Sequence, residues 1–415
     1  MAIEDSDRSI VRGLAERVAE IAALPVQKLN AAEWRRLNGL GKGKPMIFIN
    51  ELPWHEMNGS GELSILCEDE MCRGVEWQLR TTLYQWDHMR WDMVVEPFFR
   101  SPLALHNSGF GIHQEGRLLR EDTDGVYSHE FEPQMRDEKD VDRILTPKIT
   151  LDSEATERHF QTLQDLLGDI LPVRKTGVSH VWFSPWDEMI RWWGVENALM
   201  DMVERPEFVH AAMDRLVNAY LAILDQWEEL NALSFTDGNH RVGSGGLGIS
   251  DELPAPGFDP ARVRAIDQWG CATAQIFSTV SPRMHDDFAL QYEKRWLARF
   301  GLTYYGCCEP LHDKLGILKT VPNLRKISMS PWANLDQAVP VIGDRYVISH
   351  KPNPAVFATD EYSRDQAKQE LIEVLEKTRG CAVEIIMKDV STTRYDPKRL
   401  WEWTDMAREV CEQYA

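Results

Sequence analysis

Eight short apolar runs alternate with segments of helical periodicity along this chain, and this alternation restricts its fold more than any other feature. The runs are rich in β-branched, aromatic and methionine residues, and polar loops follow them. They predict strands at 45–50, 92–99, 178–183, 232–237, 302–307, 324–330, 345–349 and 382–388. Eight strand–helix units in 415 residues predict an α/β fold, specifically a (β/α)8 TIM barrel.

Helical patterns fill most of the intervals between these runs. They predict helices at 7–40, 69–88, 139–170, 188–230, 259–300 and 397–413, and Pro206 predicts a break in the fourth because proline cannot continue a helix. Residues 1–44 form an N-terminal helical arm, and residues 45–415 form the barrel. The Gly, Thr and Tyr content of 107–131 predicts a β-hairpin insertion after the second strand.

An open, doubly wound sheet would also alternate strands with helices, and it is the alternative architecture. Doubly wound sheets that bind dinucleotides carry a Gly-x-Gly-x-x-Gly turn directly after the first strand. Here the Gly-rich stretch lies at 243–248, after the fourth predicted strand, and no helix follows it immediately. The barrel is therefore the favoured prediction.

Charge and cysteine usage exclude several classes of function. Lys and Arg number 46 against 66 Asp and Glu, which gives a net charge of −20 and argues against nucleic acid or an anionic membrane surface as a partner. No run approaches the roughly 20 apolar residues of a membrane span, and the acidic N-terminus does not resemble a signal peptide. Seven scattered cysteines lack the spacing of a disulfide framework, so we expect a cytoplasmic protein.

The stretch Leu302–His312, LTYYGCCEPLH, places potential metal or proton ligands at the end of the fifth predicted strand. Cys307, Cys308 and Glu309 would make a borderline-soft site for zinc. Alternate residues of a strand share a face, so Cys308 would point away from the other two unless the backbone turns there. A cysteine pair at a strand end is also common as ordinary packing.

Active sites of (β/α)8 barrels lie at the carboxyl ends of the strands, so the residues that follow each run are the candidates for function. The candidate catalytic residues are Glu309, His312, Tyr305 and Asp237. The candidate substrate-binding residues are Glu51, Trp54, His55, Trp186, His240, His350 and Lys351. A single histidine or tryptophan of this kind is more often structural, and it is their clustering at strand ends that favours function.

Two long blocks resemble the uroporphyrinogen decarboxylase superfamily, a group of (β/α)8 proteins. They are ALMDMVERPEFVHAAMDRLVNAYLAILDQWEEL and STVSPRMHDDFALQYEKRWLARFGLTYYGCCEPLHDKLGIL. The decarboxylase branch carries arginines after the first strand, whereas this chain has NELPWHEMN, whose glutamates would repel a polyanionic tetrapyrrole. In the thiol-methylating branch a His-x-Cys and a last-strand Cys bind zinc, whereas here Tyr305 or Gly306 replaces that histidine and the last strand ends in Lys388.

The Gly-Ser-Gly-Gly loop and the Gly-Cys-Cys-Glu-Pro turn resemble the cobalamin (corrinoid)-dependent methyltransferase branch. This resemblance implies an enzyme that moves a methyl group from a small methylated donor, such as an aryl methyl ether in O-demethylation, to the cobalt of a corrinoid protein. An acid or a zinc Lewis acid would assist the leaving group. Trp54, Trp186 and Tyr305 would form an aromatic wall. The resemblance also implies a homodimer.

The chain has no Asp-x-His-x-x-Gly pattern for binding cobalamin, so the corrinoid would be carried by a partner protein. Two alternatives stay open. The first is a decarboxylase-like lyase that binds a carboxylated substrate through Arg241, Lys351 and Lys388. The second is a non-catalytic corrinoid- or ligand-binding barrel in which the thiols are structural.

Overall fold

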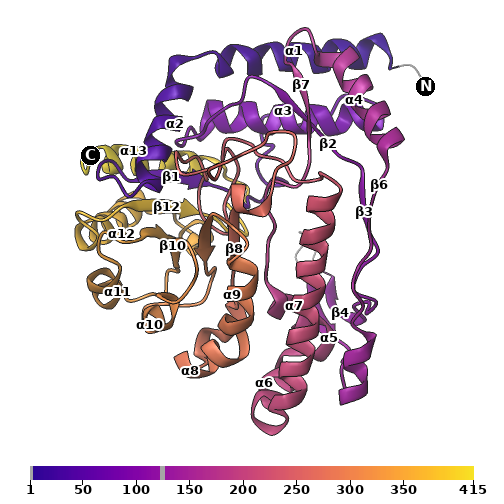
Figure 1. Ribbon diagram of the computed structural model, residues 1–415. Coiled ribbons are helices and arrows are strands. Elements are labelled where there is room, and N and C mark those ends of the chain that lie inside the picture. The colour runs from indigo at the N-terminus through magenta and orange to yellow at the C-terminus, as the bar shows by residue number, and fades with distance from the viewer. Residues whose placement is uncertain (1–2, 122–126) are drawn as a thin grey trace.

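A parallel sheet of six strands is the largest sheet in a computed structural model, which describes residues 3–121 and 127–415 (Figure 1). In spatial order its strands are β1 (Met46–Ile49), β12 (Val383–Met387), β11 (Val347–His350), β10 (Leu324–Met329), β9 (Leu302–Tyr305) and β8 (Trp269–Ala272). All neighbouring pairs are parallel. The carboxyl ends of the six strands therefore meet at one edge, which we call the carboxyl edge.

Smaller strand pairs accompany this sheet. The strand β2 (Phe99–Pro102) runs parallel to β7 (Val173–Thr176), and β3 (Leu105–Asn107) runs antiparallel to β6 (Ile149–Leu151). The strands β4 (Gly116–Glu121) and β5 (Tyr127–Phe131) pair antiparallel, which confirms the predicted hairpin insertion. The part of that insertion at 122–126 lies outside the described residues. Among the described strands the main sheet ends at β1 and β8, so the closed eight-stranded barrel is not confirmed.

Five of the eight predicted strands are confirmed: 45–50, 302–307, 324–330, 345–349 and 382–388. The prediction at 92–99 is wrong in position, because only Phe99 lies in a strand. The predictions at 178–183 and 232–237 are wrong in extent, because only Val178 and Leu233 pair, through one isolated bridge. The strand β8 falls inside the predicted helix 259–300, since a four-residue apolar run has no periodicity that separates it from a buried helix.

Thirteen α-helices surround these strands in the described residues. They are α1 (Asp5–Ala22), α2 (Pro25–Asn38), α3 (Glu70–His88), α4 (Ser153–Leu167), α5 (Pro185–Trp193), α6 (Val195–Glu204), α7 (Pro206–Glu229), α8 (Pro282–His285), α9 (Gln291–Leu297), α10 (Leu315–Leu318), α11 (Leu335–Ile342), α12 (Arg364–Lys377) and α13 (Lys398–Glu412). Prolines begin α2 and α7, where a missing N–H costs no helical hydrogen bond, and the predicted break before Pro206 is confirmed. The predicted helix 139–170 is interrupted, because a 3-10 helix at Glu138–Arg143 and the strand β6 precede α4, which begins at Ser153.

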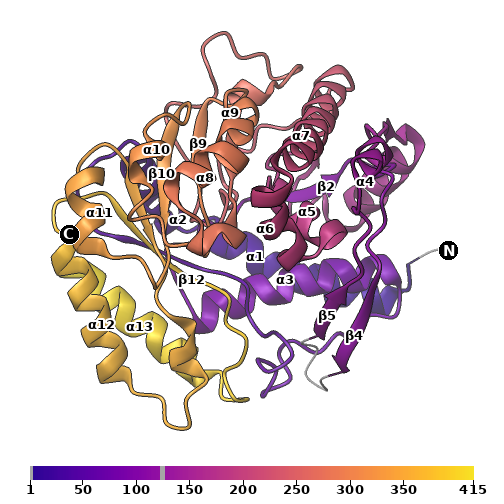
Figure 2. The ribbon, with the colours of Figure 1, turned by 90° about the horizontal axis from the view of Figure 1, so that it is seen from below.

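The N-terminal helices pack onto the rest of the fold. Helix α1 lies beside α3 in both views (Figures 1 and 2). Arg12 forms an ion pair with Asp169, with 2.6 Å between Nη2 and Oδ2. The fully buried Trp34 donates its indole N–H to the backbone oxygen of Asp92 at 2.7 Å. The arm predicted at 1–44 therefore contributes side chains to the interior.

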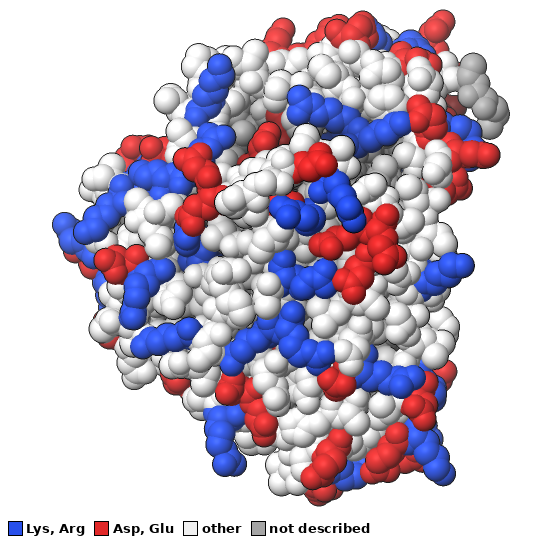
Figure 3. Space-filling view, viewed as in Figure 1, with Lys and Arg blue, Asp and Glu red and all other residues white. Residues whose placement is uncertain are grey.

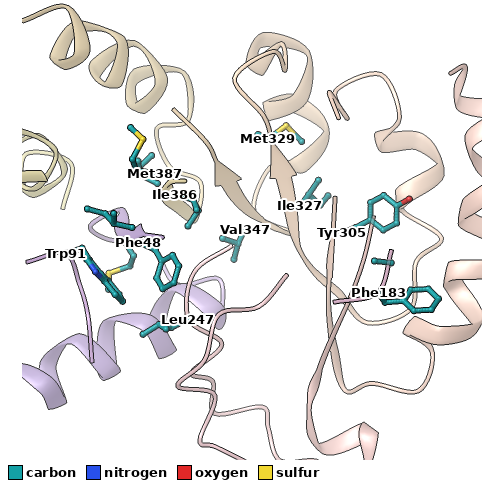
Figure 4. Packing of buried hydrophobic residues seen from close by; sticks show 14 of the residues in the cluster. Phe48, Trp91, Phe183, Leu247, Tyr305, Ile327, Met329, Val347, Ile386 and Met387 are labelled. Carbon is teal, nitrogen blue, oxygen red and sulfur yellow. The ribbon is translucent and has the colours of Figure 1, made fainter. Parts of the chain in front are cut away.

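Buried polar and charged side chains gather on one face of the main sheet, beside apolar neighbours such as Val347 and Ile386. The residues Tyr304, Lys326, Ser328, Ser349 and Glu384 share one face, which we call the polar face, because registered neighbours in a parallel sheet point the same way. The opposite face carries apolar side chains such as Ile327, Met329 and Met387, which belong to the main hydrophobic core together with residues from β1 and from the N-terminal half (Figure 4).

The glycine-rich loop at 241–248 packs against the polar face. Lys326 and Glu384 form a buried ion pair there, with 2.8 Å between Nζ and Oε2, and Glu384 Oε1 accepts the Gly246 N–H at 3.1 Å. A Cβ on Gly245 would lie 2.5 Å from Glu384 Oε1, and one on Gly246 would lie 2.4 Å from the ring of Trp34. These two glycines therefore permit close packing of the loop against the sheet.

Charged side chains of both signs are interspersed over the face shown in Figure 3. Among the described residues, no helix has the length and apolar character that crossing a bilayer requires.

Candidate functional site

A turn brings two thiols together at the carboxyl edge, directly after β9. Gly306 has φ +98°, which ends the strand and breaks its alternation. The sulfur atoms of Cys307 and Cys308 consequently lie 3.4 Å apart, although strand geometry alone would direct them to opposite faces. Cys307 is 3% exposed, whereas Cys308 is exposed to solvent.

Lys388 joins the turn to the loops that follow β1 and β12. Its Nζ lies 3.7 Å from Cys307 Sγ, 3.1 Å from Glu51 Oε2 and 2.7 Å from Asp389 Oδ2. The second oxygen of Glu51 lies 2.5 Å from Arg241 Nη1, which arrives on the glycine-rich loop. We call these residues the carboxyl-edge cluster: Glu51, Arg241, Cys307, Cys308, Lys388 and Asp389.

The cluster shifts the pKa values of its members. A hydrogen bond from Cys308 and the charges of Lys388 and Lys351 lower the pKa of Cys307 to about 7, against the effect of burial, and the pKa of Cys308 is raised. Burial would lower the pKa of Lys388, but Cys307, Asp389 and Glu51 together raise it. The thiol pair therefore loses a proton near neutral pH while Lys388 stays cationic.

The pKa values of the two carboxylates of the cluster are shifted in opposite directions. Burial would raise the pKa of Glu51, but Asp389, Arg241 and Lys388 lower it to about 2. Burial and the neighbouring Glu51 raise the pKa of Asp389. Asp389 thus holds a proton more readily than an ordinary aspartate, and Glu51 remains anionic.

A chain of hydrogen bonds connects the cluster to the polar face. Lys351 Nζ donates to Tyr304 OH at 2.9 Å and to Ser328 Oγ at 2.7 Å, and Ser328 Oγ donates to the backbone oxygen of Cys307 at 2.7 Å. Burial lowers the pKa of Lys351 to about 8. These hydrogen bonds hold the backbone of Cys307 against the polar face of the sheet.

Glu309, predicted both as a catalytic residue and as a zinc ligand, is fully buried within the turn. Its oxygens accept hydrogen bonds from Thr273 Oγ1 at 2.9 Å and from the Cys307 N–H at 2.8 Å, and burial raises its pKa. The ammonium of Lys388 lies against Cys307. The predicted zinc ligands do not fit a metal in this arrangement, and the described residues contain no other cluster of His, Cys, Asp and Glu suited to one.

Tyr305 and Trp186 lie away from the cluster, which corrects their predicted roles in catalysis and in an aromatic wall. Tyr305 projects from the face opposite Tyr304, where its hydroxyl donates to Glu293 Oε2 at 2.6 Å and lies 2.6 Å from His285 Nε2. Trp186 is fully buried and donates its indole N–H to the backbone oxygen of Phe288 at 3.1 Å. Both are core residues.

Trp54 and His55 follow β1 but are directed elsewhere. The ring of Trp54 packs against Trp77 and Tyr84, with centroids 5.8 and 6.1 Å apart, so it anchors α3. His55 is exposed, and its ring centroid lies 6.3 Å from that of Tyr395.

His350 and Lys351 are adjacent in sequence but face opposite sides of the sheet. His350 is 7% exposed on the apolar side, where burial lowers its pKa to about 3. Both residues line a pocket of about 500 Å³ between the ends of β10 and β11 and the helices α12 and α13.

His312 is half-buried in the segment after the turn.

Asp237 and His240 lie on the loop that leads to Arg241. Asp237 is exposed and lines a pocket beside the N-terminal helices, with Ala22 and Gln27, so the structure does not bring it to the cluster. His240 Nδ1 lies 2.8 Å from Thr236 Oγ1, and its ring centroid lies 5.6 Å from that of His180. Burial lowers the pKa of His240 well below its ordinary value.

The cations predicted to bind a carboxylated substrate are only partly brought together. Arg241 and Lys388 meet, but on the carboxylate of Glu51, which pairs with one cation through each of its oxygens. Lys351 lies on the polar face, where its ammonium group donates a hydrogen bond to Tyr304 OH. Lys388, Asp389 and Arg241 nevertheless form the centre of the observed site, although the leading prediction did not include them.

Comparisons with known proteins show the fold. No protein-family model matches the chain, and no curated protein matches it. Among solved structures, the chain is similar to a methyltransferase from Methanosarcina mazei, with 12% sequence identity and a TM-score of 0.52 over 91% of this chain and 97% of that chain. This similarity shows that the two proteins share an overall α/β architecture.

Proposed function

We propose that this protein is a methyltransferase that moves a methyl group from a small methylated donor, such as an aryl methyl ether, to the cobalt of a corrinoid bound to a partner protein. The observation that carries the proposal is the pairing of Lys388 with Asp389 beside the thiols at the carboxyl edge. The shared architecture with a methyltransferase supports it.

Transfer of a methyl group away from oxygen requires that the departing oxygen gain a proton or a strong hydrogen bond. Asp389 is placed to supply the proton, because its side chain is half exposed beside Lys388 and because burial and Glu51 raise its pKa above that of an ordinary aspartate. Lys388 is placed to supply the hydrogen bond, because Glu51 and Asp389 hold its ammonium group in a fixed position. Asp389 is therefore the proton donor of the proposed reaction, and Lys388 orients the leaving oxygen.

A reduced corrinoid supplies the nucleophile that accepts the methyl group. Trp332 follows β10 at the same carboxyl edge and is 70% exposed, so it offers a broad aromatic surface on which the partner's macrocycle would rest. Its exposure is unusual for a tryptophan in a folded protein, which supports a role in contacting another molecule.

The test is methylcobalamin formation from cob(I)alamin and a panel of methoxylated aromatic compounds, followed spectroscopically. We expect cobalt–carbon bond formation with at least one donor, and a rate about 100-fold lower for Asp389→Asn, the usual effect of removing a general acid. Asp344→Asn is the matched control, because Asp344 is an exposed aspartate outside the cluster. Absence of methyl transfer across the panel, or equal rates in the two variants, would contradict the proposal.

A further inference from the structure

We propose that Cys307 and Cys308 form a thiol-exchange site that reacts with small disulfides and closes reversibly into a disulfide between the two adjacent residues. The site is built by the turn at Gly306, which places the two sulfur atoms 3.4 Å apart. This inference does not depend on methyl transfer, because it concerns the thiols alone.

The two cysteines have complementary properties. Cys308 is exposed, so a small disulfide reaches its sulfur from solvent. Cys307 is 3% exposed and lies 3.7 Å from the Lys388 ammonium group, which stabilises its thiolate. The pair thus combines an accessible sulfur with a protected, charged one, and one proton is shared between them.

The exchange proceeds in two balanced steps. In the first, Cys308 attacks a small disulfide as its proton passes to Cys307 and then to solvent, so a mixed disulfide forms and one small thiolate leaves. In the second, the Cys307 thiolate attacks Cys308 Sγ, the sulfur–sulfur bond between the two residues forms, and the second small thiolate leaves. The two cysteines are oxidised by two electrons, and the small disulfide is reduced to two thiols.

The closed form stores strain, and this makes the reaction reversible. Consecutive Cα atoms lie about 3.8 Å apart, below the roughly 4.4 to 6.8 Å of most disulfides, so the bond is readily reduced by thiols. The backbone of Cys307 is held by Glu309 and Ser328, so the movement that closes the bond falls to Cys308.

The remaining cysteines do not share this environment. Cys67, Cys72, Cys271 and Cys411 are buried, and Cys381 is half-buried directly before β12, at the end of the strand away from the carboxyl edge. Burial raises the pKa of Cys381. We therefore expect exchange to be selective for the Cys307–Cys308 pair.

The test is incubation of the full chain with oxidised glutathione at pH 7, acid quenching, and mass spectrometry of the peptide spanning 300–314. We expect the wild-type peptide to lose two hydrogens, and dithiothreitol to restore them. Cys307→Ser should accumulate glutathione on Cys308, since no thiolate remains to resolve the mixed disulfide. Cys308→Ser should react at least about 10-fold more slowly, because its remaining thiol is buried. Cys381→Ser, the matched control, should behave as the wild type.

Three results would overturn the proposal: a stable mixed disulfide on the wild-type peptide, equal reaction of the Cys307 and Cys308 variants, or preferential reaction at Cys381. Cooperative urea unfolding of each variant shows that it is folded. Cys307→Ala and Cys308→Ala replace any serine variant that is not, since alanine introduces no polar group into the turn.

Discussion

Replacing Glu384 by Gln tests whether the buried ion pair on the polar face stabilises the fold. Lys326 and Glu384 are both fully buried, with 2.8 Å between Nζ and Oε2. At this distance, with an effective dielectric constant of about 20, their attraction amounts to about 6 kcal/mol, and desolvation of both groups offsets part of it. Loss of one partner from a buried pair costs about 3 to 5 kcal/mol, which is the destabilisation we expect for Glu384→Gln.

Urea unfolding followed by circular dichroism measures this loss as a lower midpoint at an unchanged slope. Burial lowers the pKa of Lys326, so the folded variant sheds the Lys326 proton as pH rises and its penalty should be smaller at pH 9 than at pH 6. Asp336→Asn is the control, because its pair with Lys377 is exposed and should contribute less than about 1 kcal/mol. A change below about 1 kcal/mol for Glu384→Gln would refute this reasoning.

Three further predictions concern other groups. Burial raises the pKa of Glu293 to about 8, so the folded state keeps a proton that the unfolded chain releases above its ordinary pKa of 4.5, and stability should fall as pH rises between these values. Glu293→Gln should abolish that fall in urea unfolding at pH 5 and pH 8. Alkylation of Cys307 by iodoacetamide, followed by mass spectrometry, should be half-maximal near pH 7, and Lys388→Met should shift that midpoint upward, because the variant loses a positive charge beside the thiolate. Gly246→Ala should destabilise the fold by about 1 to 3 kcal/mol in urea, whereas Gly59→Ala, where a Cβ meets nothing within 4 Å, should change it little.

The sequence predicted the second half of the fold better than the first. The strands β9 to β12 are short apolar runs bounded by polar loops, and each was placed to within a few residues. The runs at 178–183 and 232–237 have the same appearance, but only Val178 and Leu233 form a ladder contact. Apolar composition predicts burial, and whether a buried run also pairs as a strand depends on neighbours that are distant in the sequence.

The sequence predicts where the candidate site lies, at the carboxyl ends of the strands, but it predicts only some of the residues that form it. Cys307, Cys308 and Glu51 were selected because they follow strands, and the structure brings them together around Lys388. Lys388 lies four residues after Glu384, and residues two and four positions apart in a strand point to the same face. This spacing places Lys388 on the same side of the sheet as Glu384. The sequence indicates Arg241 and Lys388 only as cations for a carboxylated substrate, and it gives no sign that they meet at Glu51, which lies 190 residues from Arg241.

The loop that carries Arg241 connects the buried ion pair to the thiols. Glu384 accepts the Gly246 N–H, the same loop places Arg241 on Glu51, and Glu51 holds Lys388 against Cys307. Because the glycines allow the loop to lie directly on the polar face, the charge balance at the carboxyl edge depends on packing deep in the sheet. The loop therefore contributes to the charge balance around Cys307 through Glu51, whose carboxylate contacts both Arg241 and Lys388.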